Sequence, residues 1–287
     1  IQSANKYNVD FSEVKGQFVA KRALEIAVAG GHNVLMIGPP GAGKTMMAKC
    51  VPTIMPDMTF EEAIEVTKIH SVAGILDSNV GIVVGRPFRT PHHTATVPAL
   101  MGGGANAKPG EISLAHNGVL FLDEMPEYQR RTLETLRQPL EDGVAVVSRA
   151  KHNLEYPARF MLVASMNPCP CGNLGSKTQE CKCTASEIHR YISKLSGPLL
   201  DRIDLQIEVD SISYDDFRSD IVNESSKVVK DRVERARKIQ RDRYAGTSTK
   251  TNDEMTNAQV RAYCKLDEIG ELLLKNAFTR LNLSARA

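Results

Sequence analysis

The apolar residues of this chain are concentrated in short runs, each followed at once by glycine or polar residues. Three of these runs are Val34–Ile37, Val119–Leu122 and Phe160–Met166, and a further strand is expected at Leu205–Val209. Short apolar runs bounded by turn residues are typical of strands that are buried on both faces of a parallel sheet. The pattern therefore predicts an α/β protein built on an open parallel sheet.

Between the strands, apolar residues recur at the spacing of an α-helix. We expect one helix to run from Ser12, as its N-cap, to about Val28. A second helix is expected from about Met46 until Pro52 interrupts it. Further helical patterns cover residues 61–70, 128–140 and 215–243.

A β-hairpin is predicted at residues 144–156, where Val144–Ser148 and Leu154–Tyr156 flank the basic tip Arg149–Asn153. A basic tip is ordinarily just solvated; alternatively, it contacts a polymer that is threaded through a ring-shaped motor. The last residues of the chain have the pattern of a small helical unit, in which Thr256 caps a helix.

The turn after the first strand carries the pattern G-x-x-x-x-G-K-[ST] of a phosphate-binding loop. Its glycines let the backbone fold around an anion, so that N–H groups and the positive end of the next helix face the phosphates. Lys44 supplies a mobile charge for the β and γ oxygens, and Thr45 offers a hydroxyl to Mg²⁺. We predict a nucleoside triphosphate held by Gly38, Pro39, Pro40, Gly41, Ala42, Gly43, Lys44, Thr45 and Met46.

Two other buried strands also end in polar side chains, with Asp123 and Glu124 after one and Asn167 after the other. Ligands of open parallel sheets bind at the carboxyl ends of the strands. We predict that Asp123 holds Mg²⁺ and that Glu124 polarises the attacking water, which indicates hydrolysis and not binding alone. Asn167 is predicted to orient water or to contact the γ-phosphate, the alternative being a plain turn residue before Pro168.

Two further positions leave two interpretations open. Val14 and Gln17 precede the phosphate loop, and they either line an adenine pocket or belong simply to the core. Arg202 follows a predicted helix, where it either reaches the γ-phosphate of a neighbouring subunit or forms a local ion pair with Asp201 or Asp204.

Four of the six cysteines are crowded into Cys169-Pro-Cys171 and Cys181-Lys-Cys183. Two close pairs of thiolates suit a tetrahedral Zn²⁺ site. The C-x-C spacing is tighter than the usual gap of two to four residues, so a zinc site and four reduced structural thiols both stay open. Disulfides are not expected, because a nucleotide site implies the cytosol.

The composition is that of a soluble globular protein, with 42% hydrophobic and 24% charged residues. The net charge of +2 is too small to indicate nucleic acid by itself, although residues 227–243 carry eight basic and three acidic side chains. Such a basic helical face is either solvated or binds nucleic acid. Since no apolar run approaches the ~18 residues of a membrane span and no signal peptide is evident, we expect a cytoplasmic protein without a membrane partner.

With these motifs in view, the chain resembles the AAA+ ATPases, and within them the magnesium-chelatase-like YifB/ComM group of bacterial proteins. The likeness covers about residues 8–287. The stretches that carry it are Val14–Gln17, Gly38–Thr45, Arg86–His93, Gly118–Glu124, Met166–Gly172, Gly197–Asp204 and Leu283–Arg286.

The resemblance implies an AAA+ P-loop core of a parallel sheet flanked by helices, spanning residues 1–210, with channel-facing insertions at 82–110 and 144–156. It further implies a charged helical insertion at 211–246 and a truncated helical lid at 247–287, and it implies that the Lon-like N-terminal domain of the group is missing. The subunits are expected to form a homo-hexamer or similar ring with ATP and Mg²⁺ at their interfaces. By motif, the matching residues are Lys44 and Thr45 (Walker A), Asp123 and Glu124 (Walker B), Asn167 (sensor 1), Arg202 (arginine finger) and Arg286 (sensor 2).

The function favoured by these features is Mg²⁺-dependent ATP hydrolysis that drives movement along DNA, of the helicase or branch-migration type used in natural transformation or recombination. One alternative is a chelatase-type motor that remodels a protein partner, which the near-neutral net charge fits. A second alternative is a nucleotide switch without hydrolysis, against which Glu124 argues.

Overall fold

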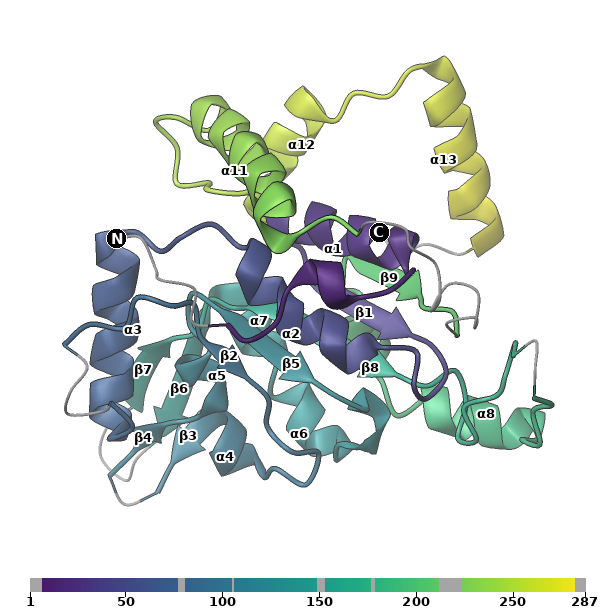
Figure 1. The fold of residues 1–287 in the computed structure, drawn as a ribbon, viewed down its shortest axis with the longest axis horizontal. Coiled ribbons are helices and arrows are strands. Elements are labelled where there is room, and N and C mark those ends of the chain that lie inside the picture. The colour runs from purple at the N-terminus through teal and green to yellow at the C-terminus, as the bar shows by residue number, and fades with distance from the viewer. Residues whose placement is uncertain are drawn as a thin grey trace.

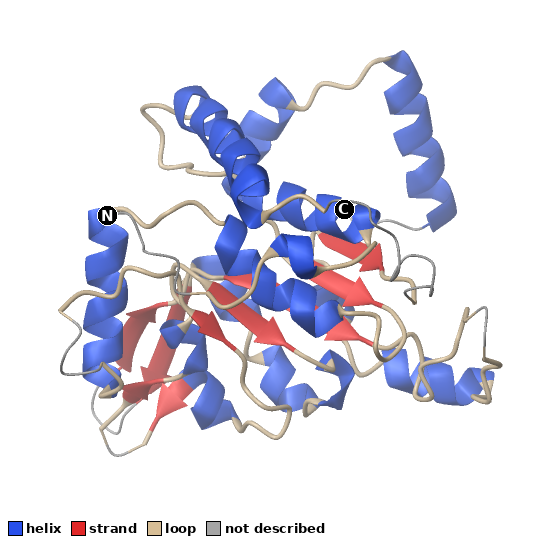
Figure 2. Cartoon of the chain, viewed as in Figure 1, coloured by secondary structure: helices blue, strands red, loops and turns tan. Residues whose placement is uncertain are grey.

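Five parallel strands form the central sheet of the computed structural model, which describes residues 7–76, 81–104, 106–148, 153–176, 179–211 and 223–281. The strand order is β2-β5-β8-β1-β9 (Figures 1 and 2), so the chain crosses over between neighbouring strands and does not pair them consecutively. The strands are β1 (Val34–Ile37), β2 (Phe88–Arg89), β5 (Val119–Leu122), β8 (Met161–Met166) and β9 (Leu205–Glu208). The α/β fold and the four strands expected from the sequence are confirmed. The two-residue β2 is too short to leave a periodic pattern.

Successive side chains of each strand point to opposite faces of the sheet, so the core consists of two clusters, one on each face. Met36 and Phe121 pack with helices α1 and α2, while Leu35 and Leu122 pack on the opposite face with the short helices α4 to α7. Because both faces are covered, the inner strands β1 and β5 are apolar throughout. The edge strand β9 instead alternates, with Gln206 and Glu208 exposed. The helices are α1 (Phe18–Gly30), α2 (Lys44–Ile54), α3 (Phe60–Ala73), α4 (Val97–Met101), α5 (Glu111–Leu114), α6 (Arg130–Glu134), α7 (Arg137–Asp142), α8 (Ala185–Ile192), α9 (Gly197–Leu200), α11 (Ser226–Arg243), α12 (Asn257–Tyr263) and α13 (Glu268–Leu281), with 3₁₀ turns at η1 (Phe11–Glu13), η2 (Met125–Glu127) and η3 (Asn252–Glu254).

The first helix was wrongly predicted as continuous from Ser12. Asp10, not Ser12, caps the short turn η1, and the chain then leaves the helical path. Gly16 and Gln17 adopt left-handed backbone conformations, with φ of 59° and 55°. An α-helix cannot pass through such residues, so α1 begins only at Phe18.

Two other predicted helices have different bounds in the structure, and each contains a proline. Pro52 does not end α2, which continues to Ile54 with the proline ring buried in the core. The helix predicted over residues 128–140 is divided into α6 and α7. Pro139 falls in the first turn of α7, where a missing N–H costs no helical hydrogen bond.

Beside the main sheet lies a pair of small antiparallel ribbons. The predicted hairpin is confirmed as β6 (Val144–Ser148) and β7 (Asn153–Pro157), with Val147 opposite Leu154. The second ribbon joins β3 (Gly102–Gly103) to β4 (Lys108–Pro109), and it lies between α3 and β6. The predicted basic tip at Arg149 and Lys151 lies outside the described residues.

The C-terminal helices gather on the side of the sheet that α1 covers. Helix α11 packs on α1 and α2, and α12 follows it with the capping box at Thr256 that the sequence predicted. Helix α13 extends away from the body of the molecule (Figure 1). No described helix combines the length and the apolar character that crossing a bilayer requires.

Candidate nucleotide site and cysteine cluster

Three strand ends meet at one edge of the sheet and bring together the predicted nucleotide-binding residues. The register pairs Ile37 of β1 with Met166 of β8, and Leu122 of β5 with Ala164 of β8. The residues after these strands are the phosphate loop, Asn167 and the Asp123–Glu124 pair, so parallel pairing alone makes them neighbours.

Lys44 lies at the centre of this edge. Its Nζ donates to the carbonyl oxygens of Gly38 at 2.6 Å and Pro39 at 2.8 Å, and to Oδ1 of Asn167 at 3.3 Å. Burial lowers the pKa of the ammonium group, and the carboxylates of Asp123 and Glu124 oppose that shift. The ammonium is therefore held in the loop by carbonyl oxygens, while the two carboxylates of the neighbouring strand favour its charged form.

The glycines of the loop serve two different purposes. Gly41 and Gly43 have φ of 78° and 86°, and a Cβ on either would meet nothing within 4 Å. The left-handed backbone therefore demands glycine there, and it turns the chain into the start of α2. At Gly38, by contrast, a Cβ would lie 2.2 Å from the carbonyl oxygen of Val209, so this glycine allows close packing against the end of β9 and does not shape the anion site.

A second group of contacts surrounds Asp123. Its Oδ2 accepts a hydrogen bond of 2.9 Å from Thr45 Oγ1, and its Oδ1 accepts one from the hydroxyl of Ser165. The N–H of Glu124 donates to the same Oδ1 and to Ser165 Oγ, both at 3.2 Å. Asp123 is thus fixed by three neighbours and faces the threonine of the phosphate loop.

Ser165 was missed by the sequence analysis. It is a fully buried hydroxyl within the apolar strand β8. Buried polar groups are almost always hydrogen-bonded, so a serine inside a strand of this kind is the signal that would have found it.

Glu124 is the exposed member of the pair, and its backbone has φ of 50°. A left-handed conformation is costly for a residue with a side chain and is found often at functional sites. The N–H contacts to Asp123 and Ser165 hold this conformation, and they leave the carboxylate in the solvent at the edge of the sheet.

The residues ahead of the loop take different positions. Val14 is buried in the core with Phe11. Gln17 instead spans the site, since its Nε2 donates to the carbonyl oxygens of Ala42 at 3.2 Å and Asp210 at 2.6 Å. It therefore ties the phosphate loop to the end of β9.

Arg202 forms a local ion pair, but not with the partners named from the sequence. Its guanidinium pairs with Glu141 and donates to the carbonyl oxygen of Pro198 at 2.7 Å. Asp204, one predicted partner, instead contacts His32. Sequence proximity suggested the wrong carboxylate because α7, which carries Glu141, is brought to α9 only by the fold. Arg286 lies outside the described residues.

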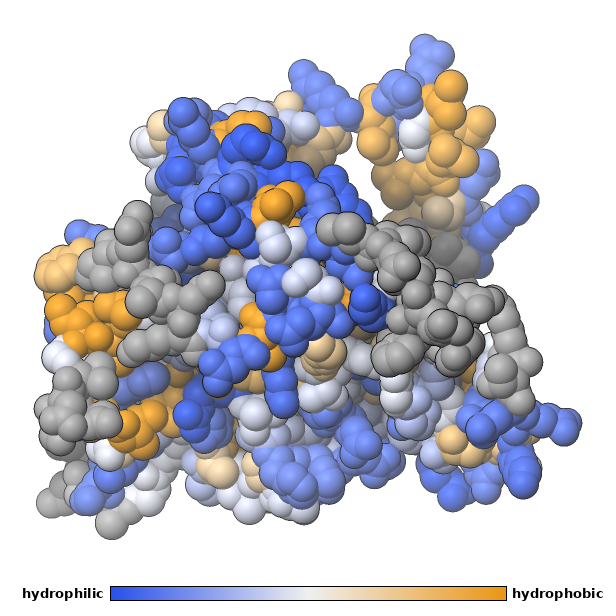
Figure 3. Space-filling view, viewed as in Figure 1, coloured by the Kyte–Doolittle hydropathy of each residue, from blue (hydrophilic) through white to orange (hydrophobic). Residues whose placement is uncertain are grey.

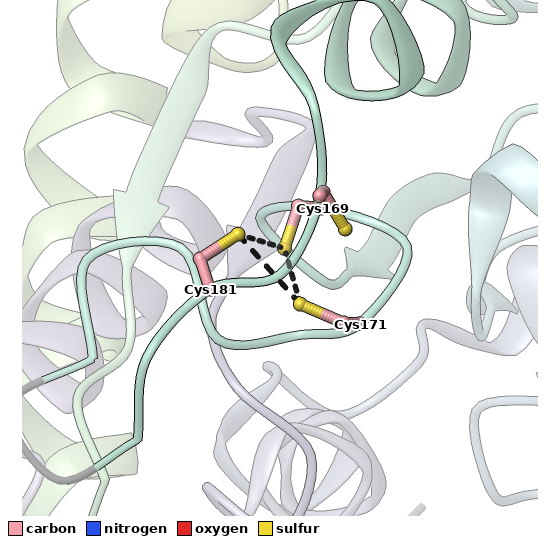
Figure 4. Close-up of side chains that lie close together, drawn as sticks. Cys169, Cys171 and Cys181 are labelled. Carbon is pink, nitrogen blue, oxygen red and sulfur yellow. Dashed lines mark hydrogen bonds between the residues drawn. The ribbon is translucent and has the colours of Figure 1, made fainter.

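The four clustered cysteines lie together after Asn167, and Figure 4 shows three of them facing one another. The Sγ atoms of Cys169 and Cys171 are 3.4 Å apart, and each lies 3.7 Å from Sγ of Cys181. Cys183 completes a group in which all four sulfurs are within 4.8 Å of one another.

Part of the basic charge of α11 is used inside the chain. Its internal contacts join Arg232 to Glu25 and Glu224, Lys230 to Asp57, and Arg237 to the carbonyl oxygen of Val28. The exposed basic residues of the helix are Lys227, Arg235, Lys238, Arg241 and Arg243. The charge counted from the sequence therefore overstates what the helix offers to a ligand.

The fold and this edge define an AAA+ module of the magnesium chelatase type. A family model described as magnesium chelatase, subunit ChlI, matches residues 10–217, and the model of the ChlI C-terminal part matches residues 223–287. The chain therefore belongs to the magnesium chelatase ChlI family, which confirms the resemblance drawn from the motifs.

Known relatives agree with this assignment. A protein named YifB from Escherichia coli (strain K12) is 46% identical over 279 residues, which are 97% of this chain and 54% of that protein. Competence protein ComM from Haemophilus influenzae is 44% identical over 288 residues, covering 100% of this chain and 55% of the relative. The chain thus spans about half the length of the curated relatives it matches.

The fold is also that of a solved assembly. A structure of the complex between subunits BchI and BchD of magnesium chelatase matches with a TM-score of 0.51 and 22% identity, covering 82% of this chain and 77% of the other. At this identity the likeness concerns the fold alone, and it confirms the predicted AAA+ architecture.

Proposed function

We propose that this chain binds ATP with Mg²⁺ at the edge formed by β1, β5 and β8, and that it hydrolyses the nucleotide there. The observation that carries the proposal is the pair of contacts across three strand ends, Lys44 with Asn167 and Thr45 with Asp123. These contacts support the proposal, because phosphoryl transfer uses a lysine, a hydroxyl, a carboxylate and an amide in close proximity.

Each residue has a distinct role in this account. Lys44 neutralises the β- and γ-phosphates, and Asn167 contacts the γ-phosphate. Thr45 and Asp123 offer oxygen donors only, which is the ligand type that Mg²⁺ prefers. Glu124 is exposed beside them and acts as the base that polarises water.

The magnesium ion, when bound, screens the negative charge of the phosphates. The protein has prepared its own side of that site, because Ser165 and the Glu124 N–H hold Asp123 in one orientation. Little reorganisation is then needed when the nucleotide arrives, and such preorganisation is a large part of electrostatic catalysis.

We further propose that the active form is a ring of identical subunits in the cytosol. Supporting features are the solved assembly with the same fold and the apolar surface of α13. Figure 3 shows that surface, whose exposed residues are Ile269, Leu272, Leu273, Leu274 and Phe278. Arg202 would then serve a neighbouring subunit's nucleotide, which requires it to leave Glu141. Arg286 would act as the sensor 2 arginine. The unpaired cysteines fit a reducing compartment.

DNA is the proposed substrate of the motor. One relative is named a competence protein, and α11 presents basic side chains outward even after its internal contacts are subtracted. The hairpin β6–β7 is the second candidate contact, through its basic tip. A protein partner is the alternative substrate, and the fold shared with the BchI–BchD complex favours it.

The experiment is ATP turnover by the full-length protein with and without branched DNA at low salt, where phosphate contacts are strongest. Stimulation by DNA is expected, and it should fall when Arg235 and Lys238 are both changed to Glu. The matched control changes Arg130 and Arg131 to Glu, since both are exposed on α6, which packs on the opposite face of the sheet.

The outcomes separate the hypotheses. Turnover without any DNA binding would favour a protein partner and would remove DNA from the account. Nucleotide binding without turnover in the assembled ring would establish a switch in place of a motor.

A further inference from the structure

We propose that Cys169, Cys171, Cys181 and Cys183 bind one Zn²⁺ ion, and that this ion fixes the loop that supports the phosphate-binding turn. The four thiols occupy the connection between β8 and α8. None of them takes part in the proposed hydrolysis, so this site is separate from the nucleotide site in its chemistry.

The spacing of the sulfurs carries the proposal. In a tetrahedral site with Zn–S bonds of about 2.3 Å, neighbouring sulfurs lie about 3.8 Å apart. The sulfur of Cys181 lies 3.7 Å from those of Cys169 and Cys171, which are themselves 3.4 Å apart. These are the edges of a tetrahedron around a single ion, and the Cys183 sulfur supplies the fourth corner within 4.8 Å of the others.

Disulfides do not explain the same arrangement. A disulfide brings two sulfurs to about 2.05 Å and separates them from other thiols. Here Cys181 is equally far from two partners, and even the nearest pair, Cys169 and Cys171, is 3.4 Å apart, well beyond the length of a disulfide bond. A set of four thiolates at mutual contact selects a soft or borderline tetrahedral ion.

Backbone groups around the thiols are arranged as they are around metal-bound cysteines. The N–H of Leu174 donates to Sγ of Cys169 at 3.3 Å, and the backbone N–H groups of Asn173 and Lys182 hydrogen-bond Cys171. Such outer contacts stabilise thiolates and orient them toward a metal. Residues 169–172 form a turn, which is closed by a hydrogen bond of 3.0 Å from the N–H of Gly172 to the carbonyl oxygen of Cys169.

The loop has a structural task that a metal would serve. Gly172 touches the phosphate loop so closely that a Cβ there would lie 2.6 Å from Cδ of Pro40. Cys169 is only two residues beyond Asn167, whose backbone N–H is directed at the hydroxyl oxygen of Tyr191 in α8. A metal that joins Cys169 and Cys171 to Cys181 and Cys183 therefore clamps the segment that supports both Pro40 and Asn167.

The test measures bound metal in the full-length protein purified without chelators. Elemental analysis should find about one zinc per chain in the wild type and in Cys264→Ser, an exposed cysteine outside the cluster. The double variant Cys181→Ser/Cys183→Ser should lose it. Replacement of the ion by Co²⁺ in the wild-type protein should give the intense thiolate-to-cobalt absorption of a four-sulfur tetrahedral site, which needs no variant to fold.

Several results would overturn the proposal. They are metal below about one ion in five chains, disulfides among the four cysteines in the freshly isolated protein, a double variant that keeps its zinc, and iron in place of zinc. All of these readouts are made without nucleotide, so they stand or fall separately from ATP hydrolysis.

Discussion

Ser165 shows how a single buried hydroxyl organises the nucleotide site. It lies within an apolar strand and donates to Asp123, while its own oxygen accepts the N–H of Glu124. The serine therefore links the two carboxylate residues to β8, the strand that Asn167 follows. Ser165 orients Asp123, the proposed Mg²⁺ ligand, so its contribution can be measured as a change in the affinity of the site for Mg²⁺.

Changing Ser165 to Ala should weaken the apparent Mg²⁺ affinity for ATP binding by about fivefold, the equivalent of one lost hydrogen bond of about 1 kcal/mol. The measurement is nucleotide binding titrated with Mg²⁺. Ser193→Ala, at an exposed serine, is the matched control and should leave it unchanged. Equal Mg²⁺ affinity in both variants would mean that Ser165 serves the core only.

Gly172 offers a test of the contact between the cysteine loop and the phosphate loop. Gly172 and Gly175 have φ of 80° and 77°, so an alanine at either position is strained by a similar ~1 kcal/mol. Only at Gly172 would the new methyl group meet Pro40. Gly172→Ala should therefore weaken ATP binding about tenfold relative to Gly175→Ala, measured with a fluorescent nucleotide. Equal affinities would show that the two loops act independently.

At the residue scale, spacing along the chain predicted the phosphate loop and the two strand-end groups, because parallel strands bring their carboxyl ends together. Spacing could not predict Ser165 or the pairing of Arg202 with Glu141, since both depend on contacts between segments far apart in sequence. The cysteine pattern predicted four candidate metal ligands, but it did not decide between a zinc site and four reduced thiols.

At the scale of elements, the attachment of α11 to α1 depends on a buried carboxylate. The side chain of Glu25 is only 8% exposed and accepts hydrogen bonds from the guanidinium of Arg232 at 2.7 and 3.0 Å. Arg232 also binds Glu224, so one arginine joins three segments. The apolar contacts of Val229 and Val233 lie beneath it.

Glu25→Gln should destabilise the fold by about 1–2 kcal/mol, because a charge-assisted hydrogen bond pair is replaced by a weaker one at a partly exposed arginine. The measurement is the free energy of unfolding in urea, with Glu155→Gln, an exposed glutamate on β7, as the control. If Glu25→Gln lowers the free energy of unfolding no more than the control does, the apolar residues alone stabilise the contact between α11 and α1.

The same pair gives a pH dependence with a definite sign. Hydrogen bonds from Arg232 lower the pKa of Glu25 in the folded protein. The stability from this group is therefore complete above the ordinary glutamate pKa near ~4.3, and it is lost as the pH falls through that value toward the folded pKa. The difference between wild type and Glu25→Gln should be constant near neutrality and shrink below about pH 4.

The elements themselves were predictable where the apolar pattern was strong. The four longer strands and the hairpin have bounds close to those expected, because they are buried or regularly alternating. The break between η1 and α1 was missed because its cause is the left-handed backbone at Gln17, which no hydrophobic pattern records. The division into α6 and α7 has a different setting, because the residues between them keep right-handed backbone and Pro139 follows in the first turn of α7.

At the scale of the whole molecule, the motifs predicted the family and the AAA+ architecture correctly. The predicted boundaries of the core, the charged insertion and the lid remain predictions. The largest error concerns surface charge. The sequence count treats every basic residue of α11 as available to a ligand, but Arg232 and Arg237 contact the body of the protein.

The central claim is that one sheet edge both holds ATP and hydrolyses it, with Glu124 as the base. The most direct measurement compares ATP affinity and steady turnover for wild type, Glu124→Gln and Lys44→Ala. Glu124→Gln should bind ATP within about threefold of wild type and lose at least ~10²-fold in turnover, the usual effect of removing a general base. Lys44→Ala should weaken binding itself by about 10–100-fold, since a charged hydrogen bond to phosphate is lost. Unchanged turnover in Glu124→Gln would contradict the account.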